Sequence, residues 1–410
     1  MTAPVLAVDF GTSNTAAAIL DGGQVRRLCI EAEEETLPTA VFFPPREDMR
    51  IGEAAVRALI DGEEGRFMRS LKSVLGTPLL HERRPIGGKR RSLAEVITAF
   101  LTELRQRAEA ESGQRFSRVL SGRPVHFHTN DAGKDAQAEA DLRSCYEAAG
   151  FTEIAFLPEP EAAARASRGE TGETGLIVDI GGGTSDFTVF RRHSQGIEVT
   201  GSHGIRLGGT DFDRTISLAL VMPEFGLGGE LTRTLADGRL PVPRAIYADL
   251  ATWAMIPFLY TAETRRMVDD LVAHAVDRTR MQRLASVLRD ELGHDVAFAV
   301  ERGKIAANSG QRGEVRLGLV ERGLAVPVTQ GAMNAALSEQ REQLRAAVYE
   351  TLMLTGTAPA EIGHVILVGG SSLMALVSDV LREVCPAART SRAEAFTAVV
   401  DGLALATAER

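Results

Sequence analysis

The sequence predicts an α/β protein that contains two copies of one structural unit, each built around a mixed sheet. A short apolar run, Val5–Val8, leads into Asp9, then an apolar residue and a glycine turn, and a second apolar run follows. The same order recurs 170 residues later, where Leu176–Val178 leads into Asp179. Apolar runs alternate with helix-like segments after each copy, as in α/β architectures with mixed sheets. We therefore expect a duplicated α/β domain whose two turns face each other across a cleft.

Local sequence signals predict the elements of the first half of the chain. Asp21–Gly23 predicts a hairpin turn between two strands. A capping-box pattern opens residues 92–111, and Gly113 is expected to end that helix. Between this helix and the second copy, we expect a strand over Val119–Phe127 and a helix over Asp135–Ala149.

The second half shows a different mixture of elements. Residues 210–308 read as mostly helical, with a Pro- and Gly-rich interruption at Pro223–Pro243. Gly313–Val328 predicts a pair of strands, and Gln330–Leu354 predicts one long helix. A last strand, Val365–Val368, runs into a Gly-Gly turn before the final helices.

The composition excludes several classes of protein. The 410 residues include 46 Lys and Arg against 55 Asp and Glu, which gives a net charge of −9 without a basic tract, so nucleic acid is not an expected partner. No apolar run is long enough to cross a membrane, and the N-terminus lacks the basic start of a signal peptide. The three cysteines, Cys29, Cys145 and Cys385, are widely spaced, which favours a reducing cytoplasm.

Four glycine turns are candidates for phosphate binding, because glycine lets backbone N–H groups approach a phosphate closely. They are Gly11-Thr12-Ser13-Asn14, Gly181-Gly182-Gly183-Thr184, Gly208-Gly209, and Gly369-Gly370-Ser371-Ser372. Each alone is more often an ordinary turn, but four in one chain favour a phosphate ligand. The sequence contains neither a P-loop nor a G-x-G-x-x-G fingerprint.

Asp9 and Asp179 are the candidate metal ligands. Each stands at a strand end before a glycine turn, where a carboxylate oxygen can reach Mg²⁺ that is also held by substrate phosphates. The alternative is that each aspartate only caps its own turn.

Taken together, the motifs resemble the ATPase domain of DnaK-type heat-shock chaperones, the heat-shock 70 family of the actin and sugar-kinase superfamily. The likeness extends over the chain in order. It rests on these segments: Val8–Asn14, Leu157–Ala164, Val178–Asp186, Leu207–Asp213, Glu301–Lys304 and Val368–Ser371. Ser70–Gly76, Gly122–Pro124 and Gly226–Glu230 are more similar to the YegD-like branch, in which the ATPase domain stands alone.

The resemblance implies a two-lobed actin-like ATPase fold of duplicated ribonuclease-H-like domains, with a nucleotide in a central cleft. Lobe I would cover residues 1–169 with the first phosphate turn. Lobe II would cover 170–410 with the second turn, the adenosine motifs and a helical subdomain at about 210–308. Whether the final helix returns to lobe I is left open. No counterpart of the peptide-binding domain is expected.

The resemblance also implies roles for individual residues. Lys72, Glu159, Asp179 and Thr184 would act on the γ-phosphate and the attacking water, and Asp9 and Asp179 would hold Mg²⁺ through water molecules. The nucleotide contacts implied are Gly11, Thr12, Ser13, Asn14, Gly181, Gly182, Gly183, Thr184, Gly208, Gly209, Glu301, Lys304, Ile305, Asn308, Gly369, Gly370, Ser371 and Leu373. Without the resemblance, Lys72 is a solvated lysine and Glu159 a surface acid between two prolines.

Two departures concern the base. Relatives of DnaK clamp adenine between two arginines, whereas Ile305 and Leu373 occupy those positions here. A guanidinium stacks on a ring face, and an aliphatic side chain gives only apolar contact.

The function expected is that of an ATP-binding, slowly hydrolysing switch, which uses ATP/ADP and Mg²⁺ and acts on an unknown protein partner. A monomer is favoured. A small-molecule kinase and a nucleotide-binding module without turnover are the alternatives.

Overall fold

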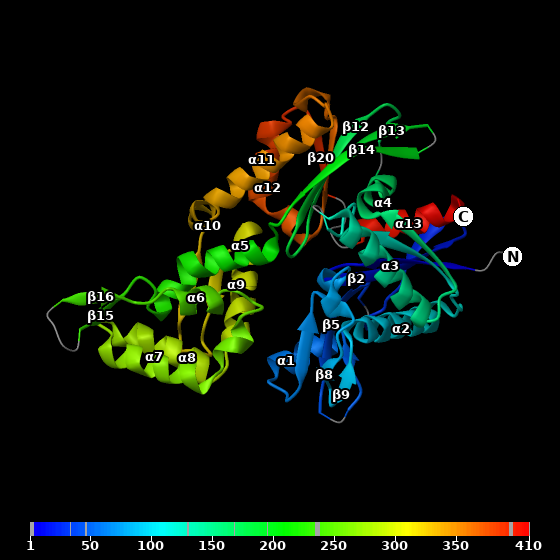
Figure 1. The fold of residues 1–410 in the computed structure, drawn as a ribbon. Helices are drawn as coiled ribbons and strands as arrows, with labels where there is room; N and C mark the ends of the chain where they lie inside the picture. Colours follow the sequence, from blue (N-terminus) through cyan, green and yellow to red (C-terminus); the bar gives the residue numbers. More distant parts are fainter. Residues whose placement is uncertain are drawn as a thin grey trace. The chain divides into compact units, whose positions relative to one another are not determined.

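The computed structural model describes residues 4–32, 34–45, 47–128, 131–167, 169–194, 196–233, 238–392 and 397–409 (Figure 1). The chain divides into two compact units. Unit 1 comprises Met1–Arg206, Arg345–Leu373 and Ser378–Arg410, and unit 2 comprises Leu207–Leu344 and Met374–Val377. These boundaries differ from the expected division at residue 170, because both large sheets fall within unit 1.

The first sheet of unit 1 has the strand order β11-β10-β1-β2-β3, with β4 also paired to β2. The central β1 runs parallel to β10, which runs parallel to β11, whereas β2 and β3 are antiparallel to their neighbours. The strands are β1 (Val5–Phe10), β2 (Asn14–Asp21), β3 (Gln24–Arg27), β4 (Thr36–Pro38), β10 (Arg118–Arg123) and β11 (Glu153–Pro158).

The second sheet repeats this topology in the order β20-β19-β12-β13-β14. Its central β12 is parallel to β19 and antiparallel to β13, as β1 is to β10 and β2. Two mixed sheets of one design confirm the predicted α/β class. The strands are β12 (Thr174–Ile180), β13 (Ser185–His193), β14 (Gly196–Ile205), β19 (His364–Val368) and β20 (Arg389–Arg392).

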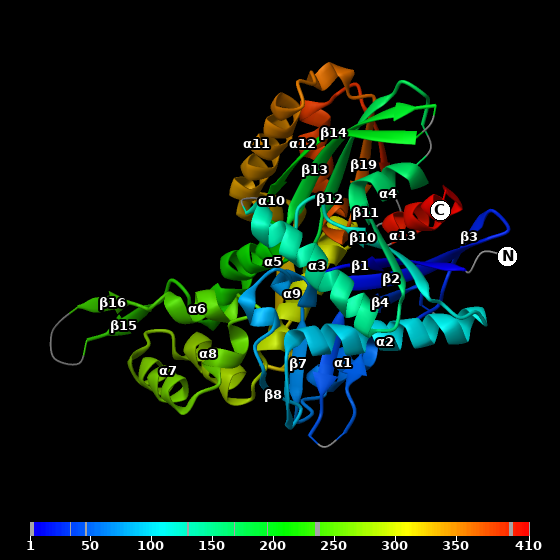
Figure 2. The same cartoon turned by 45° about the vertical axis from the view of Figure 1, so that its right-hand side comes forward.

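Two helices that are far apart in the sequence join the sheets. α4 (Glu159–Ala166) packs against α13 (Ala398–Ala406), and the two lie side by side in both views (Figures 1 and 2). α13 also contacts β1, β2 and β10, while α4 contacts β12 and β14. The crossing is close, because a Cβ atom at Gly402 would overlap the backbone of Ala162. One apolar cluster therefore includes residues from both sheets.

Two longer helices, α2 (Leu93–Ser112) and α3 (Ala132–Ala148), contribute to the core that buries the other side of the first sheet. The predicted capping box is present at Ser92, and Gly113 ends α2 in the left-handed conformation at φ 70°. α3 begins earlier than predicted, because Asp131 accepts a hydrogen bond from the Lys134 N–H and caps it.

A smaller layer connects β4 to α2. It contains a three-stranded sheet with α1 and a basic hairpin, and the 3-10 helix η1 that carries Lys72 follows β7. The elements are β5 (Ala40–Phe43), β6 (Arg50–Ile51), α1 (Glu53–Ile60), β7 (Arg66–Arg69), η1 (Leu71–Val74), η2 (Pro78–Leu80), β8 (Arg84–Ile86) and β9 (Lys89–Arg91).

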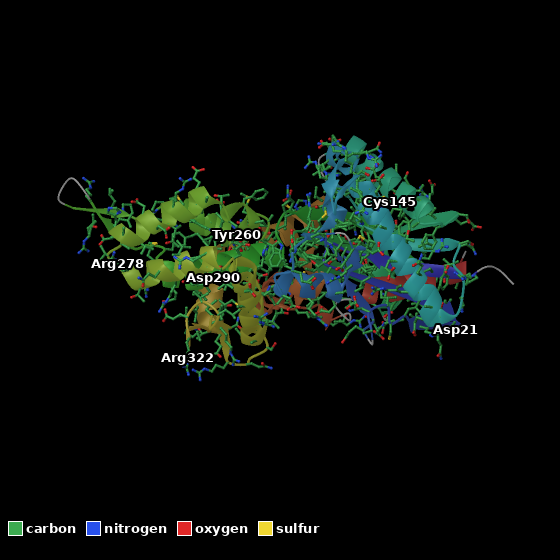
Figure 3. The ribbon with its side chains drawn as sticks, turned by 90° about the horizontal axis from the view of Figure 1, so that it is seen from below. Asp21, Cys145, Tyr260, Arg278, Asp290 and Arg322 are labelled. Carbon is green, nitrogen blue, oxygen red and sulfur yellow. The ribbon has the colours of Figure 1, made fainter. Side chains whose placement is uncertain are left out.

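Unit 2 is mainly helical. Tyr260, labelled in Figure 3, links two segments of this unit. Its hydroxyl donates a hydrogen bond to the Glu291 carbonyl and accepts one from the Gly293 N–H. The elements are α5 (Gly209–Ile216), η3 (Ser217–Val221), η4 (Met222–Phe225), β15 (Glu230–Thr232), β16 (Arg239–Pro241), α6 (Ala245–Leu250), η5 (Ile256–Leu259), α7 (Ala262–His274), α8 (Arg278–Arg289), α9 (Gly293–Asn308), β17 (Gly313–Arg316), β18 (Ala325–Val328) and α10 (Gln330–Ala336).

The long helix predicted over Gln330–Leu354 is two helices. α10 ends at Ala336, and α11 (Ser338–Leu354) continues after Leu337, which does not adopt helical dihedral angles. Buried Leu337 anchors this junction. The chain closes with η6 (Pro359–Glu361), η7 (Gly370–Leu373), α12 (Ala375–Val384) and η8 (Thr407–Glu409). Within the described part of the chain, no helix combines the length and apolarity needed to cross a bilayer.

Candidate functional site

The two glycine turns at the centres of the sheets lie next to each other in unit 1. Gly11–Asn14 connects β1 to β2, and Gly181–Thr184 connects β12 to β13. A Cβ atom on Gly182 would lie only 2.9 Å from the Ser13 hydroxyl oxygen. The first turn needs glycine, since a Cβ on Gly11 would collide with the carbonyl of Asn14. The duplicated fold thus brings two backbone turns together, each after a strand that carries an aspartate.

Lys72 forms the polar centre of the site together with Glu159. Its Nζ lies 2.5 Å from Glu159 Oε1, and their side chains are 9% and 14% exposed. Glu159 is the first residue of α4, directly after β11. The side chain of Glu159 has room because Gly122 on the neighbouring β10 has no side chain. A Cβ atom on Gly122 would lie 3.1 Å from Glu159 Cγ.

Burial and neighbouring carboxyls raise the pKa values of the acidic side chains in this site. Burial, together with the negative charge of Glu159, raises the pKa of Asp9 to about 7, although Lys72 opposes the rise. Burial also holds the pKa of Asp179 well above its usual range, with further contributions from Glu159, Asp186 and Asp9. Burial alone would lower the pKa of Lys72, but Glu159 and Asp9 outweigh it, so the pKa rises and the ammonium stays charged.

Asp186 belongs to this group, although the sequence analysis did not assign it to the site. It pairs with Asp179 across the β12–β13 ladder. Burial and the charge of Glu159 raise the pKa of Asp186 to about 7, while a hydrogen bond with the Thr184 side chain opposes the rise. The hairpin itself was the available signal, because two acids that flank a tight turn at equal distances must face each other in the ladder.

Replacing Asp186 with asparagine is expected to stabilise the free protein at neutral and alkaline pH. The folded-state pKa of about 7 lies above the ordinary value of 3.8, so folding favours the protonated form between these values. The wild type therefore loses stability as the pH rises through this window, by at most about 1.4 kcal/mol per pH unit. Denaturant unfolding of the wild type and the variant from pH 4 to 8 should show a difference that grows up to about pH 7 and then stays constant.

The matched control is Asp21→Asn, at the exposed last residue of β2 (Figure 3). It should leave the pH dependence of the wild type unchanged. A constant difference between wild type and Asp186→Asn across the whole range would contradict the burial argument.

The turn after β19 also contacts the acidic group. Gly369 has φ +79°, and a Cβ on it would lie 2.8 Å from Asp179 Oδ1 and would overlap the carbonyl of Ile180. Gly370, Ser371 and Leu373 follow in η7. The third candidate turn of unit 1 therefore lies beside the second.

The remaining predicted residues belong to unit 2. Gly208 and Gly209 open α5. On α9, Lys304 is buried and its Nζ lies 2.8 Å from Asp213 Oδ1, whereas Ile305 is 55% exposed. The other predicted residues on α9 are Glu301, which is exposed, and Asn308, whose side chain accepts a hydrogen bond from the Ala375 N–H.

The site of unit 1 has donors suited to a divalent cation beside phosphates. Carboxylate oxygens are the ligands that Mg²⁺ prefers, and burial together with neighbouring carboxyls raises the pKa values of Asp9 and Asp179, so a bound cation would favour their ionised forms. Across the described residues, however, no three His, Cys, Asp or Glu side chains are grouped so that they could hold a metal ion. A cation here would therefore need ligands from water or phosphate.

The chain matches a protein-family model. The model described as "Hsp70 protein" matches residues 5–227, which is more than half of the chain. The matched range includes both glycine turns of the sheets, Lys72, Glu159 and the start of unit 2.

Proposed function

The chain belongs to the Hsp70 family, and from this premise we propose that it binds ATP with Mg²⁺ at the paired turns and slowly hydrolyses ATP to ADP and phosphate. The observation that carries the proposal is the contact of Lys72 with Glu159 in a group of buried carboxyls between two glycine turns. Its use as a nucleotide-dependent switch for a protein partner, and its place in the YegD-like branch, are parts of the same proposal.

Phosphoryl transfer needs positioning and charge neutralisation more than covalent participation by the protein. Lys72 supplies a positive charge whose position Glu159 fixes, and this charge would stabilise the negative charge that develops on the transferred group. Glu159 would also orient the attacking water. The backbone of Gly181–Thr184 and of Gly11–Asn14 would bind the phosphates through N–H groups.

Asp9 and Asp179 would hold Mg²⁺ through water molecules. When bound, the ion supplies positive charge that neutralises the phosphate oxygens. Asp186, opposite Asp179 in the ladder, would keep the water shell in place by accepting hydrogen bonds from it.

Calorimetric titration with ADP, in the presence and absence of Mg²⁺, tests the binding site. Phosphate release from ATP, measured alone and with candidate acceptors, tests the reaction. The proposal expects Mg²⁺-dependent binding and release of phosphate without an acceptor. Phosphate transferred only to a small-molecule acceptor would identify a kinase instead, and tight binding without release would identify a module that only holds nucleotide.

Placing arginine at both Ile305 and Leu373 is expected to tighten ADP binding. Each stacked guanidinium adds roughly 0.5–2 kcal/mol to a ring contact, and 1.4 kcal/mol corresponds to a factor of ten in affinity. The double variant should therefore bind ADP about tenfold or more tightly, with better discrimination against GDP, as measured by calorimetry. The control is Leu319→Arg, which adds one arginine at a 72% exposed leucine of unit 2. Equal affinities in all three proteins would show that the two positions do not face the base.

A further inference from the structure

The segment that carries Lys72 does not hold itself in place. η1 has only four residues, and such short 3-10 helices have weak hydrogen-bond geometry. Ser70 before it is in the left-handed region at φ 59°, and Gly76 after it has φ 73°. Contacts with the rest of unit 1 must therefore determine where the ammonium of Lys72 lies.

Asp141 of α3 provides a buried polar contact to this segment. Its side chain is 4% exposed. One oxygen accepts a hydrogen bond from the Gly76 N–H at 2.9 Å, and the other accepts from His81 Nε2 at 3.1 Å and from Gln137 Nε2 at 2.8 Å. The carboxylate thus holds the segment by hydrogen bonds at both Gly76 and His81. It is not one of the carboxyls that surround Lys72.

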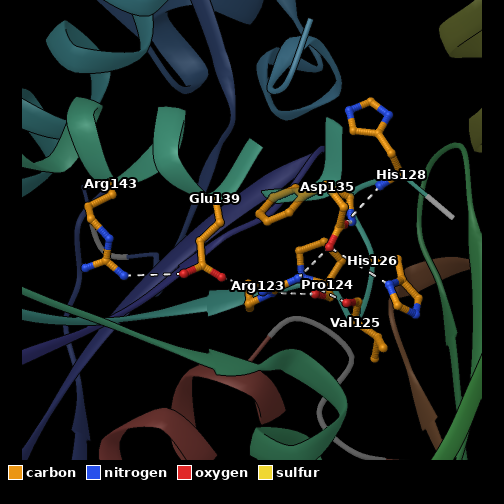
Figure 4. A network of polar contacts seen from close by, with 9 residues as sticks. Arg123, Pro124, Val125, His126, His128, Asp135, Glu139 and Arg143 are labelled. Carbon is orange, nitrogen blue, oxygen red and sulfur yellow. Dashed lines mark hydrogen bonds and ion pairs between the residues drawn. The ribbon is translucent and has the colours of Figure 1, made fainter. Parts of the chain in front are cut away.

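A second contact holds the preceding residue of the same turn. His128 Nε2 donates to the Leu75 carbonyl at 2.8 Å. The loop that carries His128 is itself fixed to α3, because Asp135 accepts hydrogen bonds from the backbone N–H groups of Phe127 and His128. Figure 4 shows this loop, in which Arg123 also contacts Asp135 and Glu139.

The turn has no room to shift toward α3. A Cβ atom on Gly76 would overlap the Lys134 carbonyl and would lie 3.0 Å from Ala138 Cβ and His128 Nε2. The turn therefore packs directly against α3, and hydrogen bonds with Asp141 and His128 hold it there.

We propose that Asp141 is a positioning residue for Lys72: by holding the Gly76 turn on α3, it fixes the ammonium at Glu159 and Asp9. The inference deepens the proposed function and rests on the role given there to Lys72. Because Asp141 acts through the backbone, its loss should displace Lys72 without removing a group that touches nucleotide.

Amine acetylation of the free protein tests the positioning without any need for activity. The chain has only four lysines, Lys72, Lys89, Lys134 and Lys304, so mass spectrometry can follow each one. In Asp141→Ala, the acetylation rate of Lys72 relative to Lys89 should rise roughly tenfold, the effect of losing a buried hydrogen bond to a charged group. Lys304, whose side chain is 8% exposed against 9% for Lys72, should keep its rate and so reports intact folding.

Two further variants make the result specific. Asp131→Ala removes the N-cap of the same helix but leaves the Gly76 turn untouched, so Lys72 should stay protected. Asp141→Asn keeps an oxygen that can accept from Gly76 and should restore most of the protection. An unchanged Lys72 rate in Asp141→Ala, or an equal rise in Asp131→Ala, would overturn the proposal.

Turnover gives the second readout. Asp141→Ala should lower kcat roughly tenfold, with KM for ATP within about twofold, and Asp141→Asn should recover most of the rate. In the Asp141→Ala background, Lys72→Ala should cost much less than in the wild type, since the ammonium is already displaced. An undiminished cost would overturn the positioning role. Absence of turnover in the wild type would refute the proposed function, while acetylation would still decide whether Asp141 holds Lys72.

Discussion

Replacing Lys72 with alanine is expected to lower the rate of ATP turnover by about 10²–10³-fold, the usual cost of removing one preorganised charge contact. The ammonium lies 2.5 Å from Glu159, and Asp9 also favours its charged form, so the substitution removes a positive charge that is held in place. ADP affinity should change less, because ADP lacks the group on which charge develops. Single-turnover phosphate release and calorimetric ADP titration measure the two effects separately.

Two control variants separate position from charge. Lys89→Ala removes an exposed lysine from β9 and should leave turnover unchanged. Lys72→Arg keeps the positive charge among the carboxyls, so it should preserve ADP binding, but the larger guanidinium cannot occupy the same place and turnover should stay low. Turnover of Lys72→Ala close to that of the wild type would return Lys72 to a structural role.

The parts of the fold that the sequence predicted are those that local chemistry determines. The turns after Asp9 and Asp179 can be predicted because a strand end, a carboxylate and a glycine lie within three residues of one another. The capping box at Ser92 and the stop at Gly113 are likewise local. The duplicated mixed sheets follow from the repeat, since equal patterns at equal spacing favour equal topology.

The contacts that complete the site are long-range, and sequence patterns do not specify such pairs. Lys72 and Glu159 are 87 residues apart, and the family resemblance was the only ground for predicting that they act at one site. Nothing in the pattern of α9 predicts that Lys304 pairs with Asp213, because a buried lysine and an exposed one can occupy the same helical period. Asp141 could not be singled out for the same reason, because it is one of several acids on α3.

The grouping of both sheets in unit 1 depends on a long-range contact as well. Counting from the repeat places a boundary near residue 170, but α4 and α13 pack together and draw both sheets into unit 1. That packing depends on the small side chains at the crossing, where Gly402 meets Ala162. The sequence shows the small residues without showing which helix they approach.

Acidic solution is expected to weaken the binding of ADP with Mg²⁺ strongly, because the site must release protons to take up the cation. The pKa values of Asp9 and Asp186 are about 7 in the free protein, and that of Asp179 is well above its usual value. Binding of a cation favours the ionised carboxylates. Below the pKa values, each proton that binding must release therefore lowers the affinity by up to about tenfold per pH unit.

The contribution of Asp186 can be isolated by comparing the wild type with Asp186→Asn in the same nucleotide solutions. Protonation of ADP itself affects both proteins equally, so it cancels in the ratio of their affinities. Well below pH 7, a protonated Asp186 resembles asparagine and the ratio should be near one. As the pH rises toward 7 the wild type gains a negative charge that the variant cannot acquire, so the ratio should grow with the pH and level off above the pKa of about 7. Calorimetric titrations from pH 5 to 8.5, repeated in two buffers of different ionisation enthalpy, report both the affinities and the protons released. Parallel affinity curves with equal proton release would show that Asp186 keeps its proton state on binding and does not take part in holding the cation.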